Sequence, residues 1–299
     1  MKKLLQRLFA PVAALLALGS AVPATARAAV ARPALWSVSD ADTTIYLFGT
    51  IHLLPENYSW RSAKLDQAVG TSQQLMVETI VDQKDPTKLM SAMAALAFNT
   101  PNLPPLADRV DPKSRPALAR SIKKSGFPPQ AFDRMETWAA AFILLGNQFK
   151  DMGLKGQEGV EIVLRNSFSG QGKPIGELET NMEQLGFFDK LPEKAQRQLL
   201  EGAIEEGKSM STDFQEMLAS WARGDVAGIA RSFNRDLAGS PELEQALIKQ
   251  RNANWSRWIE QRMRQPGAVM LAVGAGHLAG RDSVIDLLQR EGYRVRRIQ

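Results

Sequence analysis

The 299-residue sequence contains no cysteine. A chain without cysteine cannot form disulfides, thiolate metal sites or a cysteine nucleophile, and it cannot be lipidated at a cysteine. Histidine is almost as scarce, because the chain has only His52 and His277. Stability must therefore come from core packing, and chemistry that needs an imidazole has two candidate residues.

Several motifs of common enzymes are also absent. The sequence has no H-E-x-x-H, no P-loop and no G-x-S-x-G. These motifs carry the ligands, the phosphate cradle and the nucleophile of zinc proteases, nucleotide-dependent enzymes and serine hydrolases. The usual forms of those three mechanisms are not expected here.

The first residues have the order of a secretory signal peptide. Three basic residues precede a short apolar run, and small residues follow it up to Ala26 and Ala28. Cleavage near these alanines is expected. An uncleaved anchor is the alternative, but the apolar run is short for a bilayer span. We predict a signal peptide over residues 1–28 and a periplasmic or secreted mature chain over residues 29–299, with no stable membrane span.

The net charge gives little support for nucleic-acid binding. The formal charge is +5, but residues 1–28 contribute four of the basic residues and no acid, which leaves +1 for the mature chain. A nucleic-acid-binding protein usually carries a strong basic excess. The apolar content of 44% and the charged content of 23% are those of an ordinary globular protein.

Both histidines occupy the same short motif. His52 lies in "IYLFGTIHLLP" and His277 in "VMLAVGAGHLAG", each three residues after a glycine that ends an apolar run. Residues 44–78 and 268–298 both have the order strand, G-x-x-H, helix, strand. This similarity suggests an internal duplication, and parallel strands within each unit would need a right-handed crossover.

The remaining pattern predicts an α/β fold in one domain, residues 29–299. A hairpin is expected over 36–48, and the two ends of the chain are expected to build a central mixed sheet. Apolar residues at spacings of three and four predict a large helical middle region, inserted between the ends, which includes one helix over 128–153.

Four apolar strands end in an imidazole or a carboxylate. These residues are His52, Glu78, the pair Glu177 and Glu179, and His277. The carboxyl ends of parallel strands form the usual binding crevice of an α/β sheet, so we expect these side chains to meet. Imidazoles with carboxylates suit divalent Mn, Fe, Co or Zn, and an open position on such a metal activates water for hydrolysis.

Each of these residues also has a structural interpretation. A single histidine after a strand is more often structural than a ligand, but the shared motif favours a common site for both. Glu78 could instead be a charged residue that reaches solvent at the end of its strand. Glu177 and Glu179 are two positions apart, so in a strand they would share one face, which could be an exposed strand end.

Longer segments of the sequence resemble the TraB/GumN family, which includes the Tiki metalloproteases of animals and, more remotely, erythromycin-esterase-like and ChaN-like proteins. The resemblance covers nearly the whole mature chain. The segments that carry it are "YLFGTIHLLP" with the following "MVET", "GKPIGELETNMEQL", "RNANWSRWI" and "VGAGHLAGRDSVIDLLQREGYRV". The family pattern falls on Gly49 to His52, Glu78, Glu179, the pair Arg251 and Asn252, and Gly274 to His277.

The resemblance implies metal-dependent peptide cleavage, the activity of the animal members. On this basis His52, His277 and Glu179 would hold a divalent Mn, Co, Fe or Zn ion, and Glu78 would take the proton from bound water. The opposite assignment of the two glutamates stays open. Many members have a more apolar residue at the position of Glu177, so Glu179 is the favoured acid.

The expected substrate is a peptide or a protein. Arg251 would stabilise developing negative charge, and Asn252 would bind substrate. Two non-catalytic alternatives remain: a periplasmic protein that captures haem or a metal with the two histidines, and an accessory protein of envelope assembly that retains the site without using it.

Overall fold

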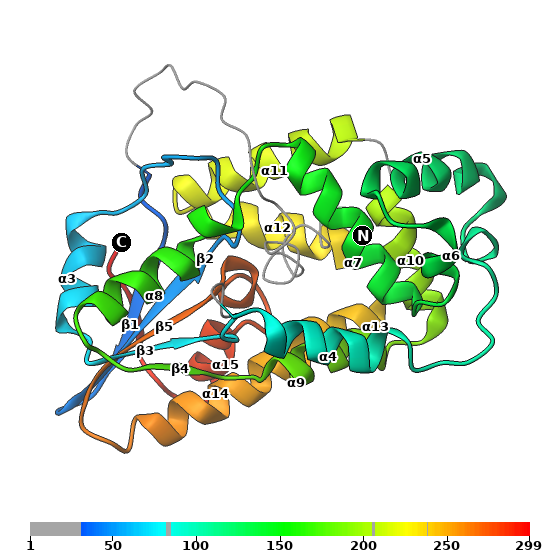
Figure 1. Ribbon diagram of the computed structural model, residues 1–299. Helices are drawn as coiled ribbons and strands as arrows, with labels where there is room; N and C mark the ends of the chain where they lie inside the picture. Colours follow the sequence, from blue (N-terminus) through cyan, green and yellow to red (C-terminus); the bar gives the residue numbers. More distant parts are fainter. Residues whose placement is uncertain (1–30, 82–84, 205–206, 238) are drawn as a thin grey trace.

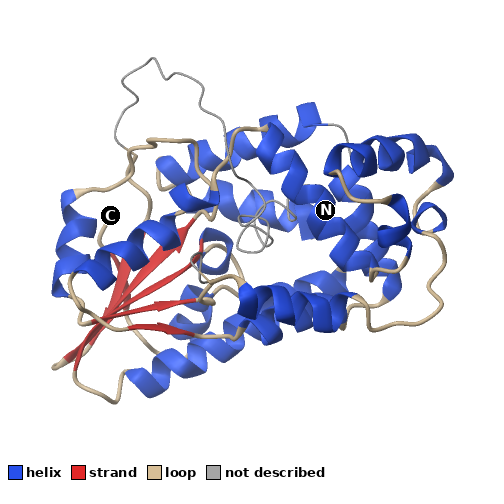
Figure 2. Ribbon diagram, in the orientation of Figure 1, coloured by secondary structure: helices blue, strands red, loops and turns tan. Residues whose placement is uncertain are grey.

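The computed structural model describes residues 31–81, 85–204, 207–237 and 239–299. The predicted signal peptide lies outside these ranges. Within them, no helix is both long and apolar enough to cross a membrane. A mixed sheet flanked by helices forms one part of the molecule, and a group of helices forms the other (Figures 1 and 2).

The chain enters the sheet through the predicted hairpin. Strand β1 (Leu35–Ser39) pairs antiparallel with β2 (Thr43–Thr50). In the turn, the carboxylate of Asp40 accepts hydrogen bonds from the backbone N–H groups of Asp42 and Thr43, at 3.2 and 2.8 Å. Such a side-chain bond to the backbone is what makes aspartate frequent in turns.

The two ends of the chain interlock in the sheet. The other strands are β3 (Gln74–Val77), β4 (Ile175–Glu177), β5 (Gly267–Gly274) and β6 (Val295–Arg297). The strand order is β4-β3-β5-β2-β1-β6, so β5 from the second G-x-x-H unit lies between β2 and β3 of the first. Strands β4, β3, β5 and β2 are parallel, and β1 is antiparallel to both neighbours. The predicted central mixed sheet is confirmed, and its four parallel strands end at one edge.

Helices cover both faces of the sheet (Figure 1). One face carries α3 (Ala63–Thr71) and α8 (Val160–Gly170), and the other carries α14 (Gln250–Arg262) and α15 (Val284–Arg290). Side chains of β5 alternate between the two cores: Met270 and Ala272 pack with α3 and α8, whereas Leu271 and Val273 pack with α14 and α15. A parallel strand buried on both faces is apolar throughout, as this one is.

The predicted helical middle region is also confirmed. Its α-helices are α4 (Thr87–Ala97), α5 (Arg115–Ser125), α6 (Pro129–Asp133), α7 (Thr137–Asp151), α9 (Asn181–Asp189), α10 (Glu193–Ile204), α11 (Gly207–Ala222), α12 (Val226–Leu237) and α13 (Pro241–Glu244). Short 3₁₀ turns are η2 (Leu106–Asp108), η3 (Pro112–Ser114), η4 (Gly156–Glu158) and η6 (Ala275–Leu278), and η5 (Gln245–Lys249) is a π-helical turn. Helix α7 is buried around most of its circumference and packs against α10.

The prediction of one helix over 128–153 is wrong, because α6 and α7 are separate. The buried guanidinium of Arg109 donates to the carbonyl oxygens of Asp133 and Met135, at 2.7 and 2.6 Å. The backbone N–H of Glu136 donates to the last carbonyl of α4. These backbone groups form hydrogen bonds with partners outside the segment. The chain therefore leaves the helical conformation between α6 and α7, although the apolar spacing continues.

Candidate functional site

The ends of the parallel strands bring the predicted residues together. His52 follows β2, Glu78 follows β3, Glu179 lies two residues after β4, and His277 lies in η6 directly after β5. All four are buried. A Cβ atom placed on Gly274 would be 3.2 Å from Glu78 Oε1, 3.6 Å from His277 Cδ2 and 3.7 Å from His52 Nε2. Three side chains from three strand ends therefore converge at this glycine.

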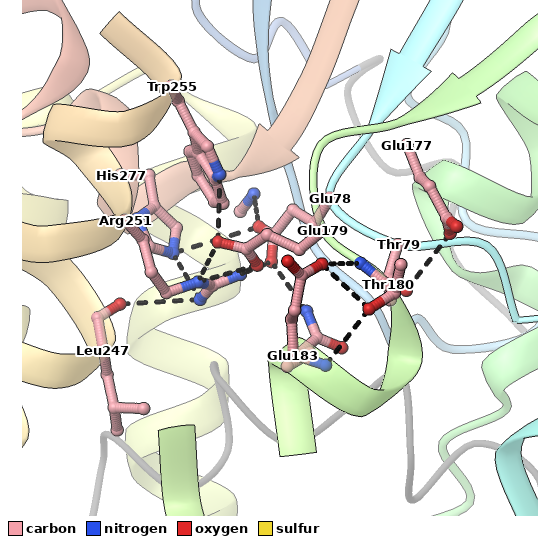
Figure 3. Close-up of polar contacts among 12 residues, drawn as sticks. Glu78, Thr79, Glu177, Glu179, Thr180, Glu183, Leu247, Arg251, Trp255 and His277 are labelled. Carbon is pink, nitrogen blue, oxygen red and sulfur yellow. Dashed lines mark hydrogen bonds and ion pairs between the residues drawn. The ribbon is translucent and has the colours of Figure 1, made fainter. Parts of the chain in front are cut away.

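The guanidinium of Arg251 lies at the centre of the cluster (Figure 3). Its Nε is 3.0 Å from both oxygens of Glu179, and its Nη2 is 2.8 Å from Glu179 Oε2 and 2.6 Å from Glu78 Oε2. Its Nη1 is 3.2 Å from His277 Nε2 and 3.5 Å from the carbonyl oxygen of Leu247. Arg251 is 2% exposed, so these contacts replace water around its charge.

Helix α14 positions the arginine and supports it. The π-helical turn η5 directly precedes this helix. Its hydrogen bonds span one residue more than those of an α-helix, and this extra residue rotates the side chains that follow. Trp255 follows Arg251 by four positions and so lies on the same face. Its Nε1 donates to Glu179 Oε1 at 3.0 Å, and its ring lies 4.7 Å from the guanidinium carbon. The tryptophan thus fixes both members of the ion pair.

Glu78 is ionised at neutral pH. Burial alone would raise its pKa, but the positive charge of Arg251, the two nearby imidazoles and a hydrogen bond from Gly274 lower the pKa to about 2. That hydrogen bond, from Gly274 N to Glu78 Oε1, is 2.6 Å long. Gln184 Nε2 lies 3.5 Å from the other oxygen. The carboxylate is therefore a fixed negative charge that links β3 to the second histidine loop, the segment after β5 that carries His277.

The second carboxylate behaves differently although it contacts the same guanidinium. Burial raises the pKa of Glu179 by more than Arg251 lowers it, and the charge of Glu78 raises it further. Two buried carboxylates share one guanidinium, so the pair cannot be neutralised completely by Arg251 alone. For the same reason the pKa of Arg251 rises above its ordinary value, although its own burial acts in the opposite direction.

His277 is held as a neutral imidazole. Its Nδ1 is 2.7 Å from Asn252 Oδ1, and its Nε2 faces Arg251. A guanidinium only donates, so Nε2 accepts and Nδ1 carries the proton that Asn252 accepts. The amide of Asn252 is oriented in turn by its donation to the carbonyl oxygen of Asp282 at 2.8 Å. Burial, with help from Arg251, lowers the pKa of His277 to about 3.

Asn252 was predicted to bind substrate, but it does not lie on an exposed surface. Its side chain is completely buried, and both polar atoms of its amide are used within the protein. In this arrangement Asn252 orients an imidazole, as partners of histidine often do. A direct contact between Asn252 and a substrate stays a prediction.

His52 has a different environment from His277, because it is paired with a carboxylate. Its Nδ1 lies 2.6 Å from Glu161 Oε1, and the hydroxyl of Thr50 also donates to that oxygen. Burial lowers the pKa of His52, but the Glu161 carboxylate outweighs this effect, so the pKa lies above the ordinary value of 6.5. With Nδ1 used, Nε2 is the atom that remains for chemistry.

A small pocket is lined by both histidines. Its volume is ≈ 20 Å³, and it is lined on one side by the two histidine loops and on the other by apolar side chains of α11 and α12, namely Met217, Trp221, Ile229 and Phe233. A volume of this size accommodates about one water molecule. The pocket therefore places a potential water site beside both histidines.

Sequence reasoning missed Glu161, which comes from the first turn of α8. This helix begins against the first histidine loop, where Val160 N donates to the carbonyl oxygen of Ile51 at 3.0 Å. The backbone of Gly159 approaches so closely that a Cβ there would overlap the carbonyl oxygen of His52. The only signal in the sequence was an acid two residues after a glycine at a helix start, and that signal does not identify its partner.

Gly159→Ala is therefore expected to displace the His52 loop. Overpacking of this kind costs about 1–3 kcal/mol, measured as the free energy of unfolding in urea. Gly170→Ala is the matched control, because Gly170 ends the same helix and a Cβ there would have no heavy atom within 4 Å. Equal stabilities of the two variants would show that the close approach does not constrain this loop.

Glu177 lies outside the cluster. Strand β4 ends at Glu177, whose carboxylate accepts a 2.6 Å hydrogen bond from the backbone N–H of Ile80 and is directed away from Arg251 (Figure 3). Glu179 lies beyond the strand, and its N–H donates to the carbonyl oxygen of Glu78 at 2.9 Å. The strand alternation that would put both acids on one face therefore does not apply to this pair.

The predicted metal ligands are close together, but the donor atoms of two of the three are already engaged. Both oxygens of Glu179 and Nε2 of His277 face Arg251, whereas His52, paired through Nδ1 with Glu161, keeps Nε2 available. In the part of the chain that the structure describes, no three His, Asp or Glu side chains are grouped so as to hold a metal ion. The predicted ligand set does not fit a metal in this arrangement.

The fold and the cluster define an α/β protein whose parallel strands end at a buried ionic site containing two imidazoles, two carboxylates and an arginine. The model of the TraB/PrgY/gumN family matches residues 34–297. The chain belongs to this family, as the sequence predicted. The wider relationship to the Tiki proteins stays a prediction.

Two relatives carry the name Uncharacterized protein YbaP. The protein from Escherichia coli (strain K12) is 24% identical over 261 residues, which cover 86% of this chain and 92% of the relative. The protein from Shigella flexneri is 25% identical over 248 residues, which cover 82% and 87%. No solved structure matches the chain.

Proposed function

We propose that this protein is a hydrolase in which His52 activates a water molecule. The observation that carries the proposal is the pairing of His52 Nδ1 with Glu161, which leaves Nε2 for chemistry in a residue that lines a water-sized pocket. A carboxylate that accepts from Nδ1 fixes the tautomer and the orientation of an imidazole and supports the positive charge that forms when Nε2 takes a proton.

Among the titratable groups of the cluster, His52 is the best suited to be the general base. An efficient base has a pKa near the working pH. The pKa of Glu78 is about 2 and that of His277 about 3, so both hold protons weakly at neutral pH. The Nε2 of His277 is also occupied by Arg251. This replaces Glu78, the base expected from the sequence, with His52 in the proposed mechanism.

Arg251 takes an indirect part in the proposed reaction. Its N–H groups already contact two carboxylates, an imidazole and a carbonyl oxygen, so it holds the cluster in place. Through Glu78 it fixes Gly274, the glycine around which the reactive groups converge. It acts as a positioning residue for the loop that carries His277.

A peptide bond is the proposed target, because the resemblance to the Tiki proteins implies peptide cleavage. Haem capture finds less support. Sites for ligands of that size measure about 300–1,000 Å³, whereas the pocket beside the histidines measures ≈ 20 Å³.

The test is cleavage of a library of fluorescence-quenched peptides by the purified mature chain. His52→Gln is expected to lower kcat by about 10²–10⁴, the usual contribution of a general base. Glu161→Gln is expected to lower kcat by a smaller factor with little change in KM, because it removes the orienting charge and leaves the base. Glu158→Gln is the control, since Glu158 lies in η4 just before α8 and is outside the cluster.

Two results would count against the hydrolase. If folded wild-type protein cleaves no peptide and no simple amide or ester, the accessory or binding protein becomes the better description. If His52→Gln retains wild-type kcat on a substrate that is cleaved, the base has been assigned wrongly. Circular dichroism of each variant verifies that the fold is intact.

A further inference from the structure

The buried cluster already contains the cation that its carboxylates require. Removing two carboxylates from water costs several kcal/mol for each ion unless an opposite charge compensates. Arg251 contacts both Glu78 and Glu179 within 3.0 Å. Its guanidinium thus supplies one positive charge at the place where a metal ion would otherwise supply two.

The arginine and a metal would also compete for the same atoms. A divalent ion held by imidazole and carboxylate needs lone pairs at about 2.0–2.2 Å. The lone pairs of Glu179, of Glu78 Oε2 and of His277 Nε2 already accept from Arg251, which leaves His52 Nε2 as a single nitrogen ligand, too few to hold an ion. A guanidinium has no acceptor and does not lose its proton, so it cannot join a coordination shell.

Arg251 is fixed in this position from several sides. The ring of Trp255 lies 4.7 Å from the guanidinium carbon, and the ring of Phe187 lies 5.6 Å from it on another element, α9. The carbonyl oxygen of Leu247 contacts Nη1. A side chain that is 2% exposed and stacked in this way has no solvated alternative position nearby.

From these contacts we infer that Arg251 occupies the place of a metal ion and that this site binds no divalent cation. The inference builds on the proposed function, because it states how the same site is neutralised while His52 activates water. It replaces the divalent metal expected from the sequence with an internal cation. Arg251 and a metal exclude one another, so loss of the arginine should create a metal site.

The first experiment measures metal on the wild-type protein, purified without a His tag. The protein is incubated with Mn²⁺, Co²⁺ or Zn²⁺ and desalted, and its metal content is then measured by inductively coupled plasma mass spectrometry. We expect much less than one equivalent. One equivalent of metal that His277→Ala and Glu179→Gln both remove would overturn the inference.

The second experiment removes the arginine. Arg251→Met leaves two carboxylates and His277 Nε2 without their cation, and it is expected to bind one equivalent of Zn²⁺ or Mn²⁺ and to gain thermal stability from it. Arg251→Lys is the matched control, because it retains a positive charge and is expected to bind no metal. A folded Arg251→Met that binds no metal would refute mutual exclusion.

A third measurement uses the wild type alone, because Arg251→Met is expected to be unstable. The ¹⁵N resonances of His277 should show a protonated Nδ1 and an accepting Nε2, and they should not change when Zn²⁺ is added. A Zn²⁺-dependent shift of Nε2 would overturn the inference. None of these experiments depends on turnover, so they give an answer even if no substrate is cleaved.

Discussion

Arg251→Met is expected to lower the free energy of unfolding at pH 7 by about 3–5 kcal/mol, the usual cost of removing one partner from a buried ion pair. Methionine fills a similar volume but leaves Glu78 and Glu179 buried without a positive partner. The two imidazoles could compensate these negative charges only if they were protonated, and His277 is neutral. Urea unfolding followed by circular dichroism measures the loss.

The control for this substitution lies on the same helix. Arg257 is exposed and donates a hydrogen bond to Asn254, so Arg257→Met should change stability by less than about 0.5 kcal/mol. Adding Glu179→Gln to Arg251→Met should restore part of the loss, because it removes one of the two uncompensated charges. A loss of similar size in both arginine variants would mean that side-chain packing, and not charge, accounts for the effect.

The sequence predicted those features of the site that follow from local patterns. His52, Glu78 and His277 each follow a short apolar strand, and parallel strands end at a common edge. These two facts suffice to gather the residues without knowing the order of the strands. They could not show that β5 lies between β2 and β3, because pairing is decided by packing across the whole sheet.

The interactions that long-range packing creates were not predictable. Glu161 reaches His52 because α8 begins against the first histidine loop, and no local pattern records that contact. The break between α6 and α7 has the same origin: Arg109, from an earlier segment, takes carbonyl oxygens that the helix would otherwise use. Periodicity describes a segment alone, so partners from elsewhere in the chain escape it.

The metal hypothesis was limited in the same way, because local patterns do not reveal contacts from distant parts of the chain. The residue types at the strand ends were those of a metal site, and the structure does bring them together. What the pattern could not reveal is that a side chain from α14 enters the centre of the cluster and supplies a positive charge. The list of potential ligands was therefore informative about proximity, whereas the identity of the cation depended on the packing of one distant helix.

Acidification from pH 6.5 to 4.5 is expected to reduce the contribution of His277 to stability, because His277 is buried as a neutral imidazole. Its pKa is about 3 in the folded protein and ordinarily 6.5. Between these values the unfolded chain binds a proton that the folded chain does not, so stability falls as the pH falls. At about 1.4 kcal/mol per pKa unit, and with the unfolded imidazole half protonated at pH 6.5, the loss from this residue is about 2 kcal/mol.

The two histidines should affect stability in opposite directions and on opposite sides of pH 6.5, which provides the test. His277→Gln keeps a donor and an acceptor at the site but cannot titrate, so the slope of unfolding free energy against pH should become flatter. The raised pKa of His52 means that the folded chain holds its proton more tightly than the unfolded chain, so this residue contributes stability below pH 6.5 that is lost as the pH rises. His52→Gln should therefore remove a loss of stability that the wild type shows as the pH rises above 6.5, and it should leave the slope between pH 6.5 and 4.5 almost unchanged. The measurement is urea unfolding at several pH values above 4.5, where Glu78, with its pKa of about 2, adds little. Identical slopes for the wild type and both variants would show that neither imidazole has the protonation state that its contacts with Arg251 and Glu161 require.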